Sequence, residues 1–182
     1  MLKSIAAALA LSLMGGLAQA STLFLEAGNW AAVYKGKTCH VYTLSSARDT
    51  SGYLEFTFEH NGLNATFDYI YTPYGPDEVE APWDEAADSV TLYLGDEPVW
   101  FGDEMFFYTA PGFTYGASLT PGFISELIGA MLVTKGDFGF AVDRAAEGET
   151  WLYGGFSLFG LDQALAKAGE MCQFDPRALP QS

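Results

Sequence analysis

The stretch from Leu92 to Thr109, LYLGDEPVWFGDEMFFYT, contains the motif Gly-Asp-Glu twice. Around both copies, apolar and aromatic residues recur at a spacing of two, which is typical of half-buried β-strands. Each Gly-Asp pair interrupts the alternation, and both residue types favour turns. The stretch therefore predicts three short strands, at 90–94, 98–101 and 104–108, joined by two turns.

The same stretch leaves a second interpretation open. Asp96, Glu97, Asp103 and Glu104 could form a metal site or an acid–base site. Consecutive turns of a meander lie at opposite ends of a sheet, which disfavours one shared site. We favour the interpretation as turns, and we expect no metal site.

The period-two pattern continues along the rest of the chain. Asn61-Gly62 lies between two alternating runs and is typical of a tight β-hairpin. Further strands are predicted at 30–34, 38–44, 53–59, 65–71, 138–142 and 150–156. The fold class is therefore mainly β, a single-domain antiparallel β-sandwich or barrel-like sheet, completed by the two helices described next.

Two segments change to helical spacing, at about 120–134 and 161–172. Thr120 supplies a possible N-cap for the first, with Pro121 at the first helical position. Its expected apolar face consists of Phe123, Ile124, Leu127, Ile128 and Met131. The buried stripe of the second helix consists of Leu161, Ala164, Leu165, Ala168 and Met171.

The first twenty residues have the features of a secretory signal peptide. Lys3 precedes a short apolar run, and Ala18-Gln19-Ala20 forms an A-x-A cleavage site. We expect cleavage after Ala20 and a periplasmic or secreted protein. The predicted organisation is a signal peptide at 1–20, one β-rich domain at 21–174 and a loose tail at 175–182.

The chain has two cysteines, Cys39 and Cys172. In an oxidising compartment an isolated pair most often forms a disulfide, which would fasten the second helix to an early strand. Two buried free thiols are the alternative. A catalytic role for Cys39 with its neighbour His40 is disfavoured, because adjacent residues of a strand point to opposite faces.

The chain is strongly acidic, with 23 acidic and 8 basic residues and a net charge of −15. Loss of residues 1–20 removes Lys3 and no acidic residue, so the mature charge is 7 − 23 = −16. Such a surface repels nucleic acid and anionic membranes, and it favours cationic partners, divalent metals or simple solubility. No stretch approaches the ~20 apolar residues of a transmembrane helix, so none is expected.

Motifs for catalysis are missing from the sequence. There is no P-loop, dinucleotide fingerprint or zinc-protease motif, and GFSLFG departs from the G-x-S-x-G elbow. His40 and His60 are the only imidazoles, one in a predicted strand and one at a hairpin tip. We therefore expect no enzyme activity, no catalytic residues and no cofactor.

The acidic segment 74–89 contains a tryptophan, Trp83, between Pro82 and Asp84. An exposed aromatic ring beside carboxylates suits sugar or peptide binding, which makes Trp83, Asp84 and Glu85 candidate ligand contacts. Packing of Trp83 onto its own segment is the alternative. The segment lacks the EF-hand spacing, so we favour a solvated loop over a calcium site.

Two terminal stretches carry a family resemblance. GNWAAVYKGKTCHVYTLSS, residues 28–46, places Cys39 shortly after a Gly-x-Trp strand, and FSLFGLDQALAKAGEMC, residues 156–172, places Cys172 at the end of an Ala-rich helix. This arrangement resembles exported proteins of the invasion-associated locus B type. The resemblance implies export, a β-sandwich with helical elements and no assigned enzyme activity. The chain lacks the family's middle cysteine, so a role in host-cell invasion is not carried over.

Together these features predict an exported, soluble, non-enzymatic protein of the bacterial envelope. It would be a binding or envelope-associated domain whose partner is a protein, a glycan or a cationic envelope component. The alternative is a periplasmic hydrolase that uses a carboxylate pair from the acidic segment or the turns. Two carboxylates within ~5–10 Å in one concave pocket would favour the hydrolase.

Overall fold

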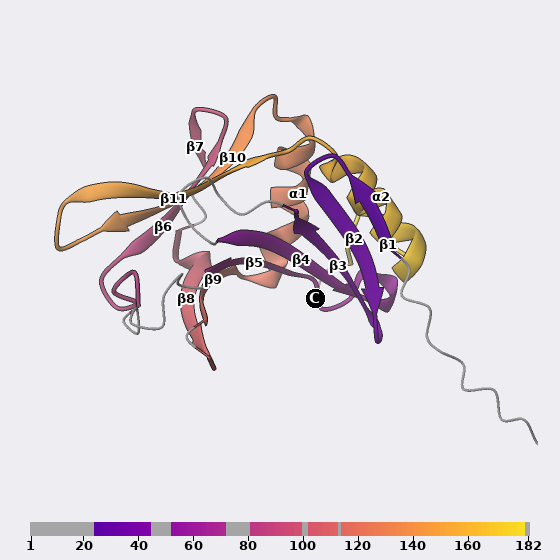
Figure 1. Ribbon diagram of the computed structural model, residues 1–182, viewed down its shortest axis with the longest axis horizontal. Helices are drawn as coiled ribbons and strands as arrows, with labels where there is room; N and C mark the ends of the chain where they lie inside the picture. Colours follow the sequence, from indigo (N-terminus) through magenta and orange to yellow (C-terminus); the bar gives the residue numbers. More distant parts are fainter. Residues whose placement is uncertain (1–23, 45–51, 72–80, 100–101, 113, 181–182) are drawn as a thin grey trace, which may run out of the picture.

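The computed structural model describes residues 24–44, 52–71, 81–99, 102–112 and 114–180 (Figure 1). Within these ranges the strands form two antiparallel sheets. The large sheet has the order β1-β2-β3-β4-β5-β9-β8, and the small sheet has the order β11-β10-β6-β7. The strands are β1 (Phe24–Ala27), β2 (Trp30–Lys35), β3 (Thr38–Thr43), β4 (Tyr53–Glu59), β5 (Thr66–Tyr71), β6 (Ser89–Leu94), β7 (Glu97–Val99), β8 (Met105–Ala110), β9 (Thr114–Leu119), β10 (Asp137–Arg144) and β11 (Glu149–Ser157). The predicted mainly β class is confirmed, in its sandwich form.

Alternation of side chains explains why these segments are strands. In β4, Leu54, Phe56 and Phe58 are fully buried, whereas the residues between them lie on the outer face. The predicted hairpin is confirmed, because β4 pairs antiparallel with β5, but its connection is longer than a tight Asn-Gly turn: it contains a 3-10 turn, His60–Gly62, in which Asn61 takes a left-handed φ of 62°.

The two sheets are joined by an aromatic core. The ring of Tyr69 in β5 stacks on Phe140 in β10, with centroids 3.9 Å apart. Phe67 meets Phe138 edge-on at 5.7 Å, one pair further along the same two strands. Such pairs stabilise by about 0.5–1.5 kcal/mol each beyond the burial of their area. These contacts hold the sheets face to face.

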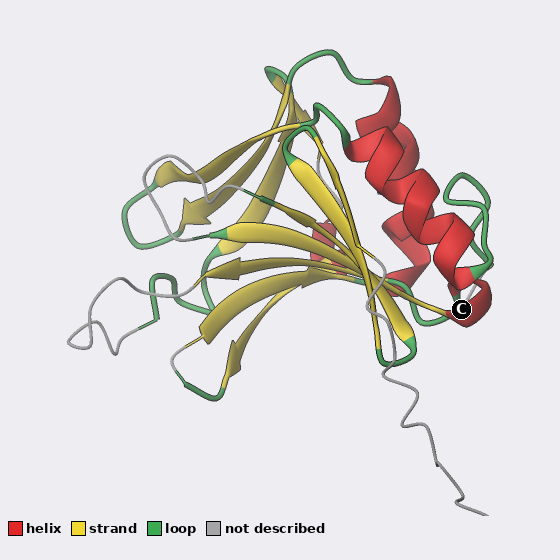
Figure 2. Cartoon of the chain, turned by 45° about the vertical axis from the view of Figure 1, so that its right-hand side comes forward, coloured by secondary structure: helices red, strands yellow, loops and turns green. Residues whose placement is uncertain are grey.

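Two helices complete the core, α1 (Ile124–Val133) and α2 (Leu161–Cys172), and α2 lies against β1, β2 and β3 (Figure 2). The predicted apolar faces are confirmed, except that Phe123 and Met171 are only partly buried. Thr120 is the N-cap residue and Pro121 the first residue of the helical segment, as predicted, but the Thr120 hydroxyl does not cap it: the hydroxyl donates to the carbonyl of Glu104 at 3.0 Å. A short 3-10 turn, Pro121–Phe123, therefore precedes the helix. None of the helices in the described part of the chain is both long and apolar enough to span a bilayer.

The second Gly-Asp-Glu differs from its prediction. Gly95 and Asp96 form the expected tight turn between β6 and β7, with Gly95 at φ +65°. The other copy forms a 3-10 turn, Gly102–Glu104, that leads into β8. Because β7 belongs to the small sheet and β8 to the large one, the chain crosses between sheets here and makes no three-strand meander.

The Cys39–Cys172 disulfide is confirmed, and the alternative of two free thiols is wrong. Cys39 lies in β3 and Cys172 ends α2, with Cα atoms 6.1 Å apart. Both side chains are buried.

The C-terminal segment differs from the loose tail that we expected from residue 175. Gln173 takes a left-handed φ of 60°, which turns the chain back after α2. The ring of Phe174 then lies 4.6 Å from the ring of Phe58, and Leu179 packs against the core. Leu179 is thus the residue of the predicted tail that packs on the apolar surface beside Gly62.

Candidate functional site

A groove of about 530 Å³ lies on the outer face of the small sheet. Its floor is formed by Gly139 and Ala141 of β10 with Gly155 of β11. Phe138 and Phe140 point into the core, so the residues that alternate with them must face outward. The groove is therefore on the opposite side of the sheet from the aromatic core.

Strand register creates the hollow. Gly139 is directly opposite Gly155 on β11 and Tyr93 on β6. A β-carbon placed on Gly155 would meet no atom within 4 Å, so the space over this strand is open. Leu152, 66% exposed, lines the β11 side, and Tyr93 lines the β6 side. At Gly139 these two side chains come close, since a β-carbon there would lie 3.0 Å from Cβ of Tyr93 and 3.6 Å from Cδ1 of Leu152, so the open part of the groove lies over Gly155.

One end of the groove is acidic. Asp96, from the turn between β6 and β7, and Asp137, from the start of β10, both line it and are both exposed. The backbone amide of Gly95 donates to the carbonyl of Asp137 at 2.8 Å, which joins the two segments. Neither carboxylate makes an ion pair or side-chain hydrogen bond with another described residue. Nor do the described residues contain a group of three or more side chains able to hold a metal ion.

The other end is held by a small polar network. Asp143 accepts hydrogen bonds from the hydroxyls of Thr91 and Thr150, each at 2.5 Å. Thr150 lines the groove, while Thr91 and Asp143 lie beside it on β6 and β10. These bonds tie the three strands together across the outer face.

Trp83 does not lie in the groove, and the expectation that its ring is exposed is wrong. The side chain is only 3% exposed. Its ring stacks on Phe107 of β8 at 5.0 Å and meets Tyr153 of β11 edge-on at 5.6 Å. The ring thus fills the opening between one edge of the large sheet and one edge of the small sheet. Burial of this large apolar surface outweighs the polarity of the flanking segment.

Asp84 and Glu85, the other predicted ligand contacts, organise the segment 81–88. Asp84 accepts from the amide of Ala86 at 2.9 Å, and Glu85 accepts from the Thr109 hydroxyl at 2.6 Å. Both carboxylates remain exposed. Trp83 is therefore buried while Asp84 and Glu85 stay at the surface, and none of the three lines the groove.

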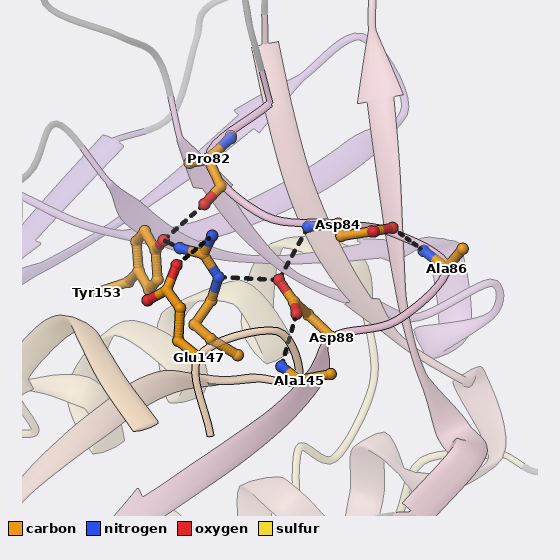
Figure 3. Close-up of polar contacts among 8 residues, drawn as sticks. Pro82, Asp84, Ala86, Asp88, Ala145, Glu147 and Tyr153 are labelled. Carbon is orange, nitrogen blue, oxygen red and sulfur yellow. Dashed lines mark hydrogen bonds and ion pairs between the residues drawn. The ribbon is translucent and has the colours of Figure 1, made fainter. Parts of the chain in front are cut away.

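A buried ion pair anchors the same segment to the small sheet (Figure 3). The Asp88 carboxylate, whose side chain is 2% exposed, lies 3.0 Å from Nε of Arg144 at the end of β10. It also accepts from the backbone amides of Asp84 and Ala145, each at 2.9 Å. Sequence reasoning missed this pair, because no local pattern brings residues so far apart in the chain together.

Tyr153 completes the network in Figure 3. Arg144 donates to the Tyr153 hydroxyl at 3.2 Å, and that hydroxyl donates to the carbonyl of Pro82 at 2.7 Å. Burial raises the pKa of Tyr153 above its ordinary value, because the phenolate would lose hydration. The guanidinium of Arg144 also lies 5.2 Å from the centre of the Trp151 ring. The network thus ties Pro82 and Asp84, the two neighbours of Trp83 in the chain, to the small sheet.

The outer face of the large sheet carries a second polar group. Nδ1 of His40 lies 2.8 Å from Glu55, on the face opposite the buried Cys39 as predicted. Glu55 is directly across from Asp68.

Two tyrosines near these carboxylates have raised pKa values. Burial raises the pKa of Tyr108, and the negative charge of Asp68 raises it further, because both disfavour a phenolate. Burial and the negative charge of Glu55 likewise raise the pKa of Tyr53.

These tyrosines predict sensitivity to alkali. Between the ordinary tyrosine pKa of about 10 and their higher folded values, the folded state holds more protons than the unfolded state. The free energy of unfolding should therefore fall as pH rises above about 10. Replacing Tyr108 by Phe should make that fall less steep. Urea denaturation at pH 8 to 11.5 measures the slope, and an unchanged slope in Tyr108→Phe would contradict the prediction.

The fold and the groove define a class: a two-sheet, disulfide-bonded β-protein with a ligand-sized groove on its smaller sheet. Comparison with family models, curated proteins and solved structures finds no match to this chain. The resemblance to the invasion-associated locus B type therefore stays a prediction.

Proposed function

We propose that this protein is an exported, soluble, non-enzymatic binding domain of the bacterial envelope, and that the groove on the small sheet is its ligand site. One observation carries the proposal. Gly139 and Gly155 face each other across adjacent strands, and glycine within a strand costs about 0.5–1 kcal/mol relative to alanine. At Gly155 the fold leaves room for a side chain, whereas at Gly139 a β-carbon would already lie 3.0 Å from Cβ of Tyr93. Access for a ligand explains why the site is left open.

The site favours binding over catalysis. The residues that line it include two carboxylates but no histidine, cysteine or lysine. Both carboxylates lie exposed at one end of the groove and are not enclosed within it. A hydrolase is the second candidate, because Asp96 and Asp137 share one concave surface. Glycosidase activity that Asp137→Asn abolishes would favour it.

Filling the groove should abolish binding without unfolding the protein. In Gly155→Phe the new ring would occupy the space over the floor. The backbone there is extended, so the melting temperature should change by no more than about 3 °C, since β-propensity spans only ~1 kcal/mol. The measurement is a ¹⁵N-NMR screen against soluble sugars, amino acids and amines.

In that screen, compounds that shift the Gly139 and Tyr93 amide signals of the parent should leave Gly155→Phe unaffected. The smaller Gly155→Ala is the graded control and should retain most of the binding. Equal shifts in the parent and in Gly155→Phe would place binding outside the groove.

Export with cleavage after Ala20 is tested separately. The full chain, expressed in a Gram-negative host, should appear in the periplasmic fraction with Ser21 as its first residue by N-terminal sequencing. Replacing Ala18 by Asp should block cleavage, because the A-x-A site requires small residues. A mature protein that retains Lys3 would contradict the proposal of export.

A further inference from the structure

We infer that the ligand of the groove is a small organic cation: a free molecule with a flat or slender apolar body and one amidinium, guanidinium or ammonium group. The inference rests on the proposed function, since it names the ligand class of the same site. It follows from the charge at one end of the groove, the shape of the floor and the character of the walls.

The acidic end selects the sign of the ligand's charge. Asp96 and Asp137 enter the groove without a cationic partner among the described residues. Lys135 is near the same turn, but it does not line the groove and makes no ion pair with a described residue. Across the whole chain the net charge is −15. A cation is therefore attracted both locally and at long range, and an anion is repelled.

The floor selects the shape of the body. From Asp137 the groove runs along β10 over Gly139 and Ala141, with Gly155 alongside. Glycine and alanine leave a smooth surface with no polar side chain to satisfy. Tyr93 offers an aromatic wall, and Leu152 an aliphatic one. Such walls suit an apolar ring or chain, and a tyrosine face also attracts cations.

The polar side chain at the far end of the groove already has a hydrogen-bond partner. Thr150 lines the groove there, but its hydroxyl already donates to Asp143. The ligand therefore needs no second polar group at that end, because the Thr150 hydroxyl donates within the protein. The volume of about 530 Å³ falls within the ~300–1,000 Å³ of small-molecule sites. A molecule with one charged end and one apolar end matches this asymmetry, and the charged end would lie at Asp96 and Asp137.

The test uses benzamidine as the probe and benzamide as its neutral counterpart of the same shape. Benzamidine should shift the amide signals of Gly139 and Gly155 in a saturable ¹⁵N-NMR titration, and benzamide should bind at least roughly tenfold more weakly, because charge-assisted contacts are the stronger ones. Asp96→Asn and Asp137→Asn should each weaken benzamidine binding several-fold, and the double variant by roughly tenfold or more.

Glu97→Gln and Glu104→Gln are the matched controls. Each substitution removes one negative charge from a Gly-Asp-Glu motif, and neither glutamate lines the groove. They should weaken benzamidine binding clearly less than either aspartate variant does, because neither side chain lines the groove. Melting curves of all variants check that the exposed substitutions leave the fold intact.

Several outcomes overturn the inference. Equal binding of benzamide, an equal effect of the Glu97 and Glu104 controls, or no binding of benzamidine and simple alkylamines would each do so. A short arginine-containing peptide that binds much more tightly than any free cation would assign the groove to a protein partner. The Gly155→Phe screen tests the proposed function independently of these outcomes. Failure of the cation inference is therefore distinguishable from failure of the proposed function.

Discussion

Removal of the Cys39–Cys172 disulfide is expected to lower the free energy of unfolding by about 4 kcal/mol. The two cysteines are 133 residues apart in the chain, so the bridge strongly restricts the unfolded state. The variant for this test is Cys39→Ala with Cys172→Ala, because alanine adds no polar group to a buried site. The melting temperature should fall by roughly 10 °C for a domain of this size.

The disulfide variant should still fold. The inner stripe of α2 buries Leu161, Ala164, Leu165 and Ala168 against the sheet without the bridge. Reduction of the parent should lower its stability to that of the variant, and a reductant should not affect the variant itself. Mass spectrometry of a non-reduced digest gives an independent check. Alkylation of Cys39 and Cys172 without reductant would contradict the prediction.

Replacement of Gly160 by alanine is expected to destabilise the protein by more than about 3 kcal/mol, among the largest effects of a single substitution. Gly160 precedes α2 at φ +94°, where a side chain is disfavoured by about 1–2 kcal/mol. In addition, a β-carbon there would lie only 1.8 Å from the carbonyl oxygen of Ala27. Ala27 is the last residue of β1 and pairs with Trp30, so relief of the clash must disturb the sheet.

Gly148→Ala is the matched control for this prediction. Gly148 also has a positive φ, +66°, but a β-carbon there meets no atom within 4 Å. It should therefore cost only the conformational penalty of about 1–2 kcal/mol. Urea denaturation of both variants measures the difference. Equal losses in the two variants would show that the junction between β1 and α2 tolerates a side chain.

The local pattern of the sequence predicted most strands well, because alternation in β4 and β5 is imposed by a face that must be buried. It missed β9, where Gly116, Ala117 and Ser118 have little strand propensity. That strand forms because it is paired on both sides, with β5 and with β8. Gly116 also leaves space for the ring of Tyr108, which would collide with any β-carbon there.

The candidate site was predicted less well. The exposure of Trp83 could not be decided from a polar flanking segment, because the rings that cover it, Phe107 and Tyr153, come from both sheets. The first Gly-Asp-Glu was correctly predicted as a turn. That this turn brings Asp96 next to Asp137 depends on how β6 pairs with β10.

The sequence by itself determined the β class and the two helical faces, because each follows from periodicity along a short segment, and it favoured the pairing of the two cysteines that the structure confirms. Only the tertiary structure decided where the groove lies. The hollow at Gly155 depends on this residue lying opposite Gly139, and strand register is fixed by the burial of a whole sheet face. The position of the groove therefore follows from how the strands pack, and a local pattern of residues does not contain that information.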